Sequence, residues 1–397
     1  MVWTMIQQER HETLVSTPWN ESEVRNAILE IASSALSRFD PESLWPSHPL
    51  DGVPDGVAGM YMGAAGVILA LDHLKRAGAV DYALDFVPAL PGLVERDNAW
   101  LKNAPLGSYG SLLMGDLGTH LMAMRLAPDA RTADRIYARA SDNNALPLIE
   151  LMWGTAGSML ACVFMDELTG EDRFAALYRA QAARLLADLE DFGPCRLWLQ
   201  DLYGQRVHCV GLVHGFCGNM LALIRGWRWL SVEQQRMVGD ATMQTLAATA
   251  CPSGSGANWP TKAEQSDAPM LCQICHGAPG VLAGVAAAPF GSPEFEALLV
   301  DAGNLVWAAG PLKKGSNFCH GTGGNAYAML ALYKRTGDAR WLQRARAFAM
   351  HAVTQLRAAT QEYGRGRYSL WTGDPGLAVC LWSCITGEPK YPGLDAI

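Results

Sequence analysis

Hydrophobic residues along this chain form two kinds of stretch that alternate. The first kind is largely apolar, as in Val67–Leu71 and Ala326–Leu332, and it follows a Gly-x-x-Gly element. Successive elements lie about 40 to 60 residues apart, a spacing that indicates a repeat architecture. Seven elements open such apolar stretches, at Gly63–Gly66, Gly115–Gly118, Gly154–Gly157, Gly215–Gly218, Gly277–Gly280, Gly321–Gly324 and Gly373–Gly376.

Glycine also marks where several apolar stretches stop, at Gly78, Gly170, Gly337 and Gly387. A glycine just past the end of a helix supplies the left-handed residue of a C-terminal cap. The repeats therefore predict buried helices that are bracketed by glycines.

The second kind of stretch is amphipathic, with apolar residues at helical spacing among Arg, Lys, Asp and Glu. Such stretches predict an outer layer of helices, each paired with one apolar helix in a hairpin. Seven hairpins that close on themselves predict an all-α, double-layered α/α toroid. The amphipathic stretches are Glu21–Phe39, Tyr82–Leu101, Ala130–Ser141, Phe174–Phe192, Glu233–Ala250, Phe295–Ala309 and Ala339–Arg357.

No run of alternating residues predicts a large sheet, although short β-hairpins are compatible with loops 195–209 and 362–371. A closed ring of repeats favours one domain over residues 1–397, with residues 1–20 as an N-terminal extension. Half of the residues are hydrophobic and 18% are charged, which is enough to bury a sizeable core.

The net charge of −8 and the isoelectric point near 5.6 argue against a nucleic-acid partner, and no basic stripe is visible. No apolar run reaches the roughly 18 residues of a membrane helix, so we expect no membrane insertion. The N-terminus lacks the basic start and apolar core of a signal peptide, which favours a cytoplasmic protein with reduced cysteines. The acidic surface and the closed ring are compatible with a monomer.

Cysteine and histidine gather just before three of the repeat glycines. His214, His276 and His320 each precede a Gly-x-x-Gly element, and Cys275 and Cys319 precede two of those histidines. Equivalent repeat positions are expected to bring Cys275, Cys319 and His320 together at one end of the barrel, near inner-helix N-termini. Two thiolates and one imidazole leave zinc a fourth position for water or substrate, which is typical of a catalytic zinc site.

The spacing alone leaves other interpretations open. Packing of buried thiols explains the same residues, and Cys272 with Cys275 forms a rival Cys-x-x-Cys motif, although no second motif completes a four-thiolate site. Cys272 and His276 are expected in the core or behind the ligands. The remaining cysteines lie on apolar faces, as expected of structural thiols: Cys162, Cys195, Cys209, Cys217, Cys251, Cys380 and Cys384.

These motifs resemble the lanthionine synthetase C family, and most closely its eukaryotic-type LanC-like members. The resemblance extends from the first Gly-x-x-Gly element to the last, and the pair of Cys-His-Gly motifs with Leu-Lys-Lys-Gly before the second is specific. The family fold is an α/α toroid of seven inner and seven outer helices, which agrees with the helices predicted above. The matching segments are Glu150–Gly157, His214–Gly218, Gln273–Gly280, Leu312–Gly321 and Ser369–Gly376.

The resemblance implies a site and a reaction. Cys275, Cys319 and His320 are the implied ligands of one zinc ion, and His214 is the implied acid/base residue. Glu150 stands where family cyclases carry an acidic residue, to assist His214 or to orient a substrate amine, with a capping or solvated role as the alternative. Family enzymes add a thiol to the β-carbon of dehydroalanine or dehydrobutyrine. Zinc deprotonates such a thiol, and a histidine with a pKa near neutrality suits protonation of the α-carbon.

The first ligand motif departs from one branch of the family. Bacterial peptide cyclases usually carry Trp-Cys-Tyr-Gly there, with an arginine four residues before the cysteine. This chain has Ile274, His276 and Leu271 at those three positions. The departure weakens an interpretation as a lantibiotic cyclase.

Basic residues near the second ligand motif point to an external thiol. Lys314 matches the LanC-like lysine that is associated with glutathione, and Arg365 and Arg367 are further candidates for the mouth of the site. A basic side chain there suits a glutathione carboxylate or a phosphate, with a surface position as the alternative.

Three functions therefore stay open. We favour a zinc enzyme that joins a thiol such as glutathione to dehydroamino acids in peptides or proteins. A lanthionine cyclase would instead use a cysteine of the same dedicated precursor peptide, and a non-catalytic adaptor would bind thiols or peptides and keep zinc for stability. An α/α-barrel glycosidase needs a pair of carboxylates that the sequence does not single out, and prenyltransferase-like zinc enzymes lack the Gly-x-x-Gly series.

Overall fold

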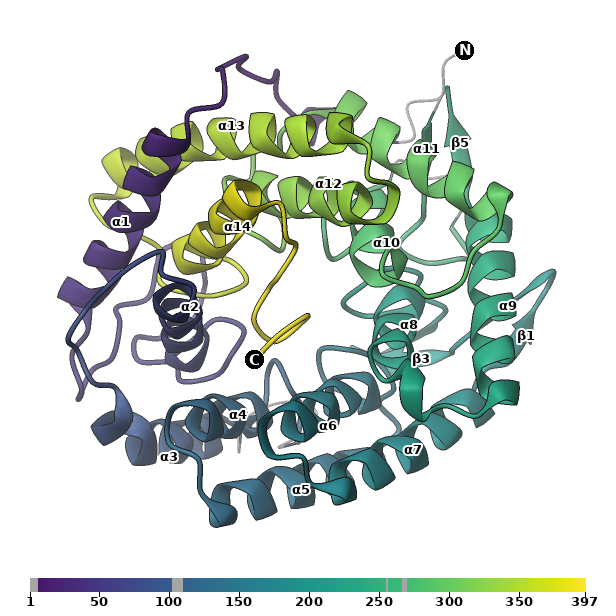
Figure 1. Cartoon of the computed structure of the whole chain (residues 1–397), viewed down its shortest axis with the longest axis horizontal. Coiled ribbons are helices and arrows are strands. Elements are labelled where there is room, and N and C mark those ends of the chain that lie inside the picture. The colour runs from purple at the N-terminus through teal and green to yellow at the C-terminus, as the bar shows by residue number, and fades with distance from the viewer. Residues whose placement is uncertain (1–5, 102–109, 255, 266–269) are drawn as a thin grey trace.

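Helices dominate the structure and form two concentric layers (Figure 1). The structure is a computed structural model that describes residues 6–101, 110–254, 256–265 and 270–397. The inner layer holds α2 (Ala64–Arg76), α4 (Asp116–Leu126), α6 (Thr155–Thr169), α8 (Phe216–Arg225), α10 (Ala278–Val285), α12 (Thr322–Thr336) and α14 (Asp374–Thr386). The outer layer holds α1 (Glu21–Arg38), α3 (Leu90–Leu101), α5 (Ala130–Asn144), α7 (Asp172–Ala187), α9 (Val232–Thr249), α11 (Pro293–Ala309) and α13 (Ala339–Tyr363). Within the described residues, no helix combines the length and the apolar character needed to span a membrane.

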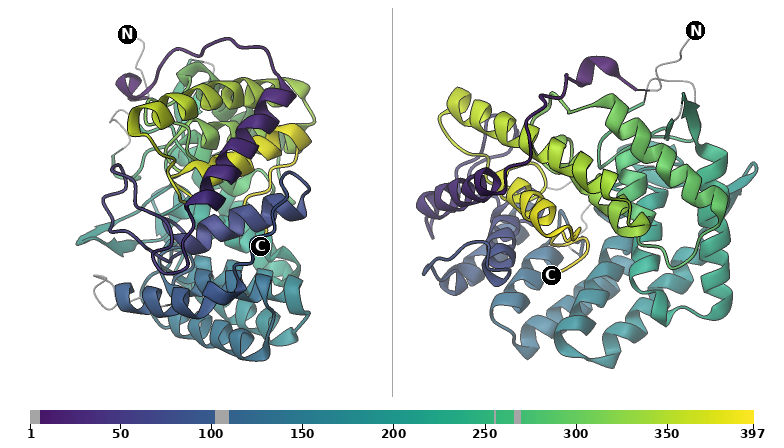
Figure 2. Two further views of the ribbon diagram at one scale, coloured as in Figure 1. Left: turned by 90° about the vertical axis from the view of Figure 1, so that its left-hand side faces the viewer. Right: turned by 45° about the horizontal axis from the view of Figure 1, so that its top comes forward.

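The inner helices close into a ring. Each packs against the inner helices before and after it, and α14 packs against α2 to complete the circle. Each outer helix packs against at least one inner helix, as α13 does against α12 and α1 does against α14. Figure 2 shows the two layers from two further directions. The predicted all-α, double-layered toroid is confirmed.

The Gly-x-x-Gly elements set where the inner helices begin. In all seven repeats the first glycine is the N-cap residue of the inner helix. The second glycine allows a close approach, because a β-carbon on Gly66 would overlap the carbonyl oxygen of Met60 and lie 2.7 Å from Cβ of Leu370 in the neighbouring repeat. The other six repeats show the same overlap with the carbonyl of the residue six positions earlier. The motif therefore shapes the turn and the packing between repeats.

Replacing Gly66 by alanine is expected to destabilise the protein by about 1–3 kcal/mol, because the added carbon overpacks a backbone contact. The matched control is Gly92→Ala in α3, where an added β-carbon meets nothing within 4 Å. Alanine there is expected to stabilise the helix by about 0.5–1 kcal/mol. Urea unfolding of the two variants measures both free energies, and equal effects would contradict the role given to Gly66.

Glycine ends the inner helices where the sequence predicted it. Gly170, Gly337 and Gly387 adopt left-handed conformations at the ends of α6, α12 and α14, with φ between 67° and 75°. Gly78 has φ 72° just after α2. These four caps confirm the predicted bracketing of helices by glycines.

Two outer helices are shorter than predicted. The stretch from Tyr82 becomes α-helical only after Pro88, where a 3₁₀ turn at Val87–Ala89 leads into α3. The cause is Pro88, because proline lacks a backbone N–H and disfavours a helical residue before it. The stretch ending at Phe192 leaves the helix after Ala187, and its last residues form strand β1. The prediction of helix over 82–86 and 188–192 was therefore wrong.

In the part of the chain that the structure describes, three antiparallel β-hairpins of three-residue strands lie in the loops. They pair β1 (Glu190–Phe192) with β2 (Cys195–Leu197), β3 (Gln200–Leu202) with β4 (Gln205–Val207), and β5 (Cys251–Ser253) with β6 (Gly256–Asn258). The expected hairpin in loop 195–209 is present as β3–β4. The one considered for 362–371 is not, because α13 continues to Tyr363 and the rest of this fully described segment forms no strand.

The first and last segments that the structure describes pack on the toroid. The N-terminal segment runs beside the loop after α11, where Glu12 N–H donates to the carbonyl of Pro311 and Lys313 N–H donates to that of Arg10. The C-terminal segment turns into the middle of the ring (Figure 1), and the buried Tyr391 stacks on Phe318 with ring centroids 3.6 Å apart. This stacking supports the backbone directly before Cys319.

Candidate functional site

Tight turns precede the inner helices, and they share one construction. In several of them the residue four positions before the first glycine accepts a hydrogen bond from the residue just before that glycine. Asn317 Oδ1 accepts from His320 N–H at 2.9 Å, and Ser111 Oγ accepts from Met114 N–H at 3.1 Å. Glu150 does the same for Trp153 N–H through a carboxylate oxygen. These turns fix the direction of the side chains just before the glycine.

Backbone hydrogen bonds tie four neighbouring turns into an arc. Cys275 N–H donates to the carbonyl of Cys319, Cys319 N–H to that of Trp371, and Trp371 N–H to that of Tyr61. All four residues occupy the same repeat position, two residues before the first glycine. The arc brings side chains from the first, fifth, sixth and seventh repeats to one end of the barrel.

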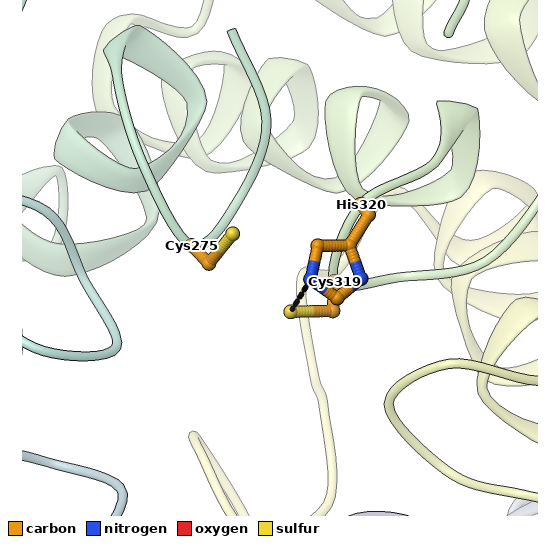
Figure 3. Close-up of side chains that lie close together, drawn as sticks. All are labelled: Cys275, Cys319 and His320. Atoms are coloured by element: carbon orange, nitrogen blue, oxygen red, sulfur yellow. Dashed lines mark hydrogen bonds between the residues drawn. The ribbon is translucent and has the colours of Figure 1, made fainter. Parts of the chain in front are cut away.

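Cys275, Cys319 and His320 form a cluster that can hold a metal ion (Figure 3). Their ligand atoms lie within 4.8 Å of one another, and Cys319 Sγ lies 3.6 Å from His320 Nε2. Both cysteines are buried and His320 is partly exposed. Cys275 comes from the turn before α10, and the other two residues come from the turn before α12.

The two thiols favour a single negative charge between them. Burial opposes ionisation of Cys275, but its hydrogen bond with Cys319 and the nearby His276 and His320 hold the pKa of Cys275 well below its usual value. Burial and the neighbouring Cys275 raise the pKa of Cys319. Both cysteines also lie at the N-terminal ends of inner helices, where the helix dipole favours negative charge.

This donor set fits zinc. Two buried sulfurs and one imidazole nitrogen, close enough to share one ion, are the ligands that zinc takes in sites with an open fourth position. Cys272, the rival Cys-x-x-Cys partner, is fully buried and lies outside the cluster.

His214 lies beside this cluster and pairs with Glu150. Its Nδ1 is 2.8 Å from Glu150 Oε2, and its ring centroid is 6.4 Å from that of His276. Glu150 is fully buried, whereas the side chain of His214 keeps 20% of its surface exposed. Glu150 contacts the partly exposed His214 from a buried position, which favours the role of assisting His214 over that of orienting a substrate amine.

Glu150 sets the charge on His214. Burial of the ring lowers the pKa of His214, but the hydrogen bond and the charge of Glu150, together with the charge of Cys275, outweigh burial and raise it. Glu150 also accepts hydrogen bonds from the backbone N–H groups of Met152 and Trp153. The arrangement therefore favours the protonated imidazole more than an isolated histidine does.

An aromatic side chain packs against the ring of His214. Tyr203, at the tip of the β3–β4 hairpin, meets the His214 ring edge-on at 5.8 Å and accepts a hydrogen bond from Trp153 Nε1 at 2.8 Å. Tyr203 has a left-handed backbone with φ 53°, and 61% of its surface is exposed. A non-glycine residue held in this conformation is uncommon and recurs at functional sites.

Basic side chains surround a small pocket near the turn before α12. Lys314, Arg365, Arg367 and His48 line it together with Asn317, Thr372 and Asp374. Arg367 forms an ion pair with Asp51 at 2.5 Å, and its side chain is only 16% exposed. Among the described residues, Lys314 and Arg365 have no carboxylate within ion-pair distance. Lys314 and Arg365 are thus better placed than Arg367 to meet an anionic group.

Comparison with known proteins agrees with the class that the fold and site define, an α/α toroid with a Cys2His cluster at one end. The sequence model described as lanthionine synthetase C-like protein matches residues 54–395. The chain therefore belongs to the lanthionine synthetase C-like family.

Individual relatives include plant and fish proteins. The chain is 30% identical over 260 residues to LanC-like protein GCL1 of Arabidopsis thaliana, which covers 62% of this chain and 57% of that protein. It is 27% identical over 310 residues to "Glutathione S-transferase LANCL1" of Danio rerio, which covers 73% of both. The fold is similar to that of a nisin cyclase, with a TM-score of 0.61 over 92% of this chain and 94% of that one, at 16% identity.

Sequence reasoning missed three residues at the site. Tyr61 donates a hydrogen bond to Cys319 Sγ, Gln273 donates one to Cys275 Sγ, and Tyr203 covers His214. A usable signal existed for two of them. Tyr61 shares the repeat position of Cys275 and Cys319, and Gln273 shares that of Glu150.

Proposed function

We propose that this protein catalyses the zinc-dependent addition of a thiol, glutathione in particular, to dehydroalanine or dehydrobutyrine residues of peptides or proteins. The observation that carries the proposal is the Glu150–His214 pair standing next to the Cys275–Cys319–His320 cluster. One half supplies a metal position for a thiol, and the other supplies a positioned proton.

Each part has a defined task. Cys275, Cys319 and His320 would hold zinc, which when bound lowers the pKa of a thiol at the open position. The thiolate sulfur forms a bond to the β-carbon of the dehydro residue, and the π electrons of the double bond move toward the carbonyl. His214 delivers a proton to the α-carbon, and the proton lost by the thiol restores the acid. The product is a thioether, and no further reactant is consumed.

The basic pocket supports glutathione as the thiol. Glutathione carries two carboxylates at a distance from its sulfur, and Lys314 and Arg365 offer unpaired positive charges beside the turn that presents Cys319. An ammonium or guanidinium group binds such carboxylates. His214, with Tyr203 packed on it and Trp153 bonded to Tyr203, offers a polar and aromatic face for the acceptor peptide.

Mass spectrometry of the zinc-loaded protein with glutathione and a dehydroalanine peptide tests the function. The expected result is a one-to-one glutathione adduct that requires both zinc and His214. An adduct that forms only when the peptide carries its own cysteine would indicate a lanthionine cyclase instead. Zinc-loaded protein that forms neither product would indicate a binding role.

The ten cysteines, all free thiols in the structure, agree with a reducing compartment, and we propose the cytoplasm as the location. A thiol-using reaction also depends on a supply of reduced glutathione, which that compartment holds.

Replacing Lys314 by alanine is expected to raise the Michaelis constant for glutathione several-fold while kcat changes little. The exposed ammonium contributes to binding of a carboxylate but stands apart from the reacting atoms, so its loss weakens binding uniformly. Steady-state kinetics with each substrate varied in turn measure this. Lys390→Ala, which removes an exposed lysine that does not line this pocket, is the control. An unchanged constant for glutathione in Lys314→Ala would remove this residue from the site.

A further inference from the structure

Both sulfurs of the metal cluster receive a hydrogen bond from a buried polar side chain. Tyr61 Oη lies 3.0 Å from Cys319 Sγ and donates to it, and Gln273 Nε2 lies 2.9 Å from Cys275 Sγ and donates to it. Tyr61 and Gln273 are 7% and 4% exposed. Neither residue is a metal ligand of the usual kind for zinc, which takes Cys, His, Asp and Glu.

Tyr61 is held against Cys319 by the arc of turns. Its ring stacks on Trp371 with centroids 5.5 Å apart and planes at 22°, and its carbonyl accepts from Trp371 N–H. Trp371 in turn accepts from Cys319 N–H through its own carbonyl. The first repeat thus contributes a hydroxyl to a thiol of the sixth repeat across the seam where the ring closes.

Gln273 departs from the usual role of its repeat position. Glu150 and Asn317 stand at the same position, and their side chains accept the N–H of the residue before the glycine. In the fifth repeat that N–H, from His276, bonds to the backbone carbonyl of Gln273 instead. This frees the Gln273 amide to point at Cys275 Sγ, one hydrogen-bond length away.

We propose that Tyr61 and Gln273 are positioning residues that fix and electronically tune the two cysteine ligands, one donor for each sulfur. The inference rests on the proposed metal site. A sulfur that accepts a hydrogen bond gives less electron density to the metal, and in a buried site the bond also offsets part of the cost of its negative charge. Hydrogen-bond partners behind metal ligands commonly change metal affinity 10- to 100-fold when removed.

Cobalt substitution tests the proposal without an activity assay. Cobalt(II) bound to thiolates shows sulfur-to-metal charge-transfer bands, and their energy falls when the sulfur becomes richer in electrons. Tyr61→Phe keeps the ring that stacks on Trp371 and removes only the hydroxyl, and Gln273→Leu removes the amide. Each variant is expected to move the band to longer wavelength, and zinc affinity measured against a chromophoric chelator is expected to fall about 10-fold or more.

Tyr178→Phe is the matched control, because Tyr178 is also fully buried and its hydroxyl donates to the carbonyls of Ala222 and Leu223, away from both sulfurs. Its cobalt band is expected to stay in place even if the protein loses stability. A cobalt band at the wild-type wavelength in both Tyr61→Phe and Gln273→Leu would overturn the tuning role and leave the proposed function intact. A wild type that binds no cobalt or zinc would overturn the metal site and the tuning role together.

Discussion

Replacing Cys319 by alanine is expected to leave the purified protein without zinc, where the wild type carries about one ion per chain. The loss removes one of two charged ligands and leaves Cys275 and His320, too few to hold the ion tightly. It also removes the sulfur that accepts the hydrogen bond of the Tyr61 hydroxyl. Loss of a hydrogen-bond partner behind a metal ligand lowers activity by up to roughly 100-fold. Loss of the ligand itself is expected to lower the rate of thioether formation by more than that. Elemental analysis and adduct mass spectrometry of the same sample measure both quantities.

Cys272→Ala is the control for this change. Cys272 is a buried cysteine three residues before Cys275, and it belongs to the rival Cys-x-x-Cys motif, yet its sulfur lies outside the cluster. Its replacement is expected to keep zinc and activity, apart from a small packing cost. Full zinc occupancy in Cys319→Ala together with zinc loss in Cys272→Ala would show that the ligands were assigned to the wrong pair.

The fold was predictable because the information that defines it is local and repeated. In each of seven repeats one glycine begins a helix and a second lies against a backbone carbonyl. The same glycine spacing therefore recurs seven times in the sequence and predicts helix starts such as those at Gly63 and Gly321. Boundaries that depend on a single proline or on a turn were missed. Helix α3 starts late because of Pro88, and β1 forms because the turn at Gly193 pairs Phe192 with Cys195.

The site was predictable only where its residues carry distinctive chemistry. Cysteine and histidine before a repeat glycine are rare enough to notice, and the structure brings Cys275, Cys319 and His320 together. Tyr61 and Gln273 are ordinary core residues by composition, and only the three-dimensional closure of the ring places them against sulfur. Arg367 was predicted as a candidate because of its charge. The sequence did not show that Asp51, far away along the chain, forms an ion pair with it.

Removing His214 is expected to lower kcat by about 10²- to 10⁴-fold while zinc stays bound, the usual contribution of a positioned acid. His214 is not within the ligand cluster, so His214→Ala removes the proton donor without removing a sulfur or nitrogen from the metal. Zinc content by elemental analysis and single-turnover adduct formation separate the two effects. Loss of zinc in this variant would mean that His214 acts on the metal site itself.

Glu150→Gln is expected to move the pH dependence of the reaction. As an acid, His214 works in its protonated form, so activity is present below its pKa and is lost as pH rises through it. Glu150 holds that pKa above the ordinary value against the opposing effect of burial. With a neutral amide in place of the carboxylate, burial prevails, the pKa falls and the basic limb of kcat shifts to lower pH.

Glu264→Gln supplies the comparison, because Glu264 makes a similar contact of 2.6 Å with Nδ1 of another histidine, His208, outside the site. In Glu264→Gln, kcat is expected to fall at high pH over the same range as in the wild type. A basic limb that stays in place in Glu150→Gln would assign the essential proton to a group other than His214. A shift in Glu150→Gln alone would show that a fully buried carboxylate sets the pH range of the reaction through its contact with His214.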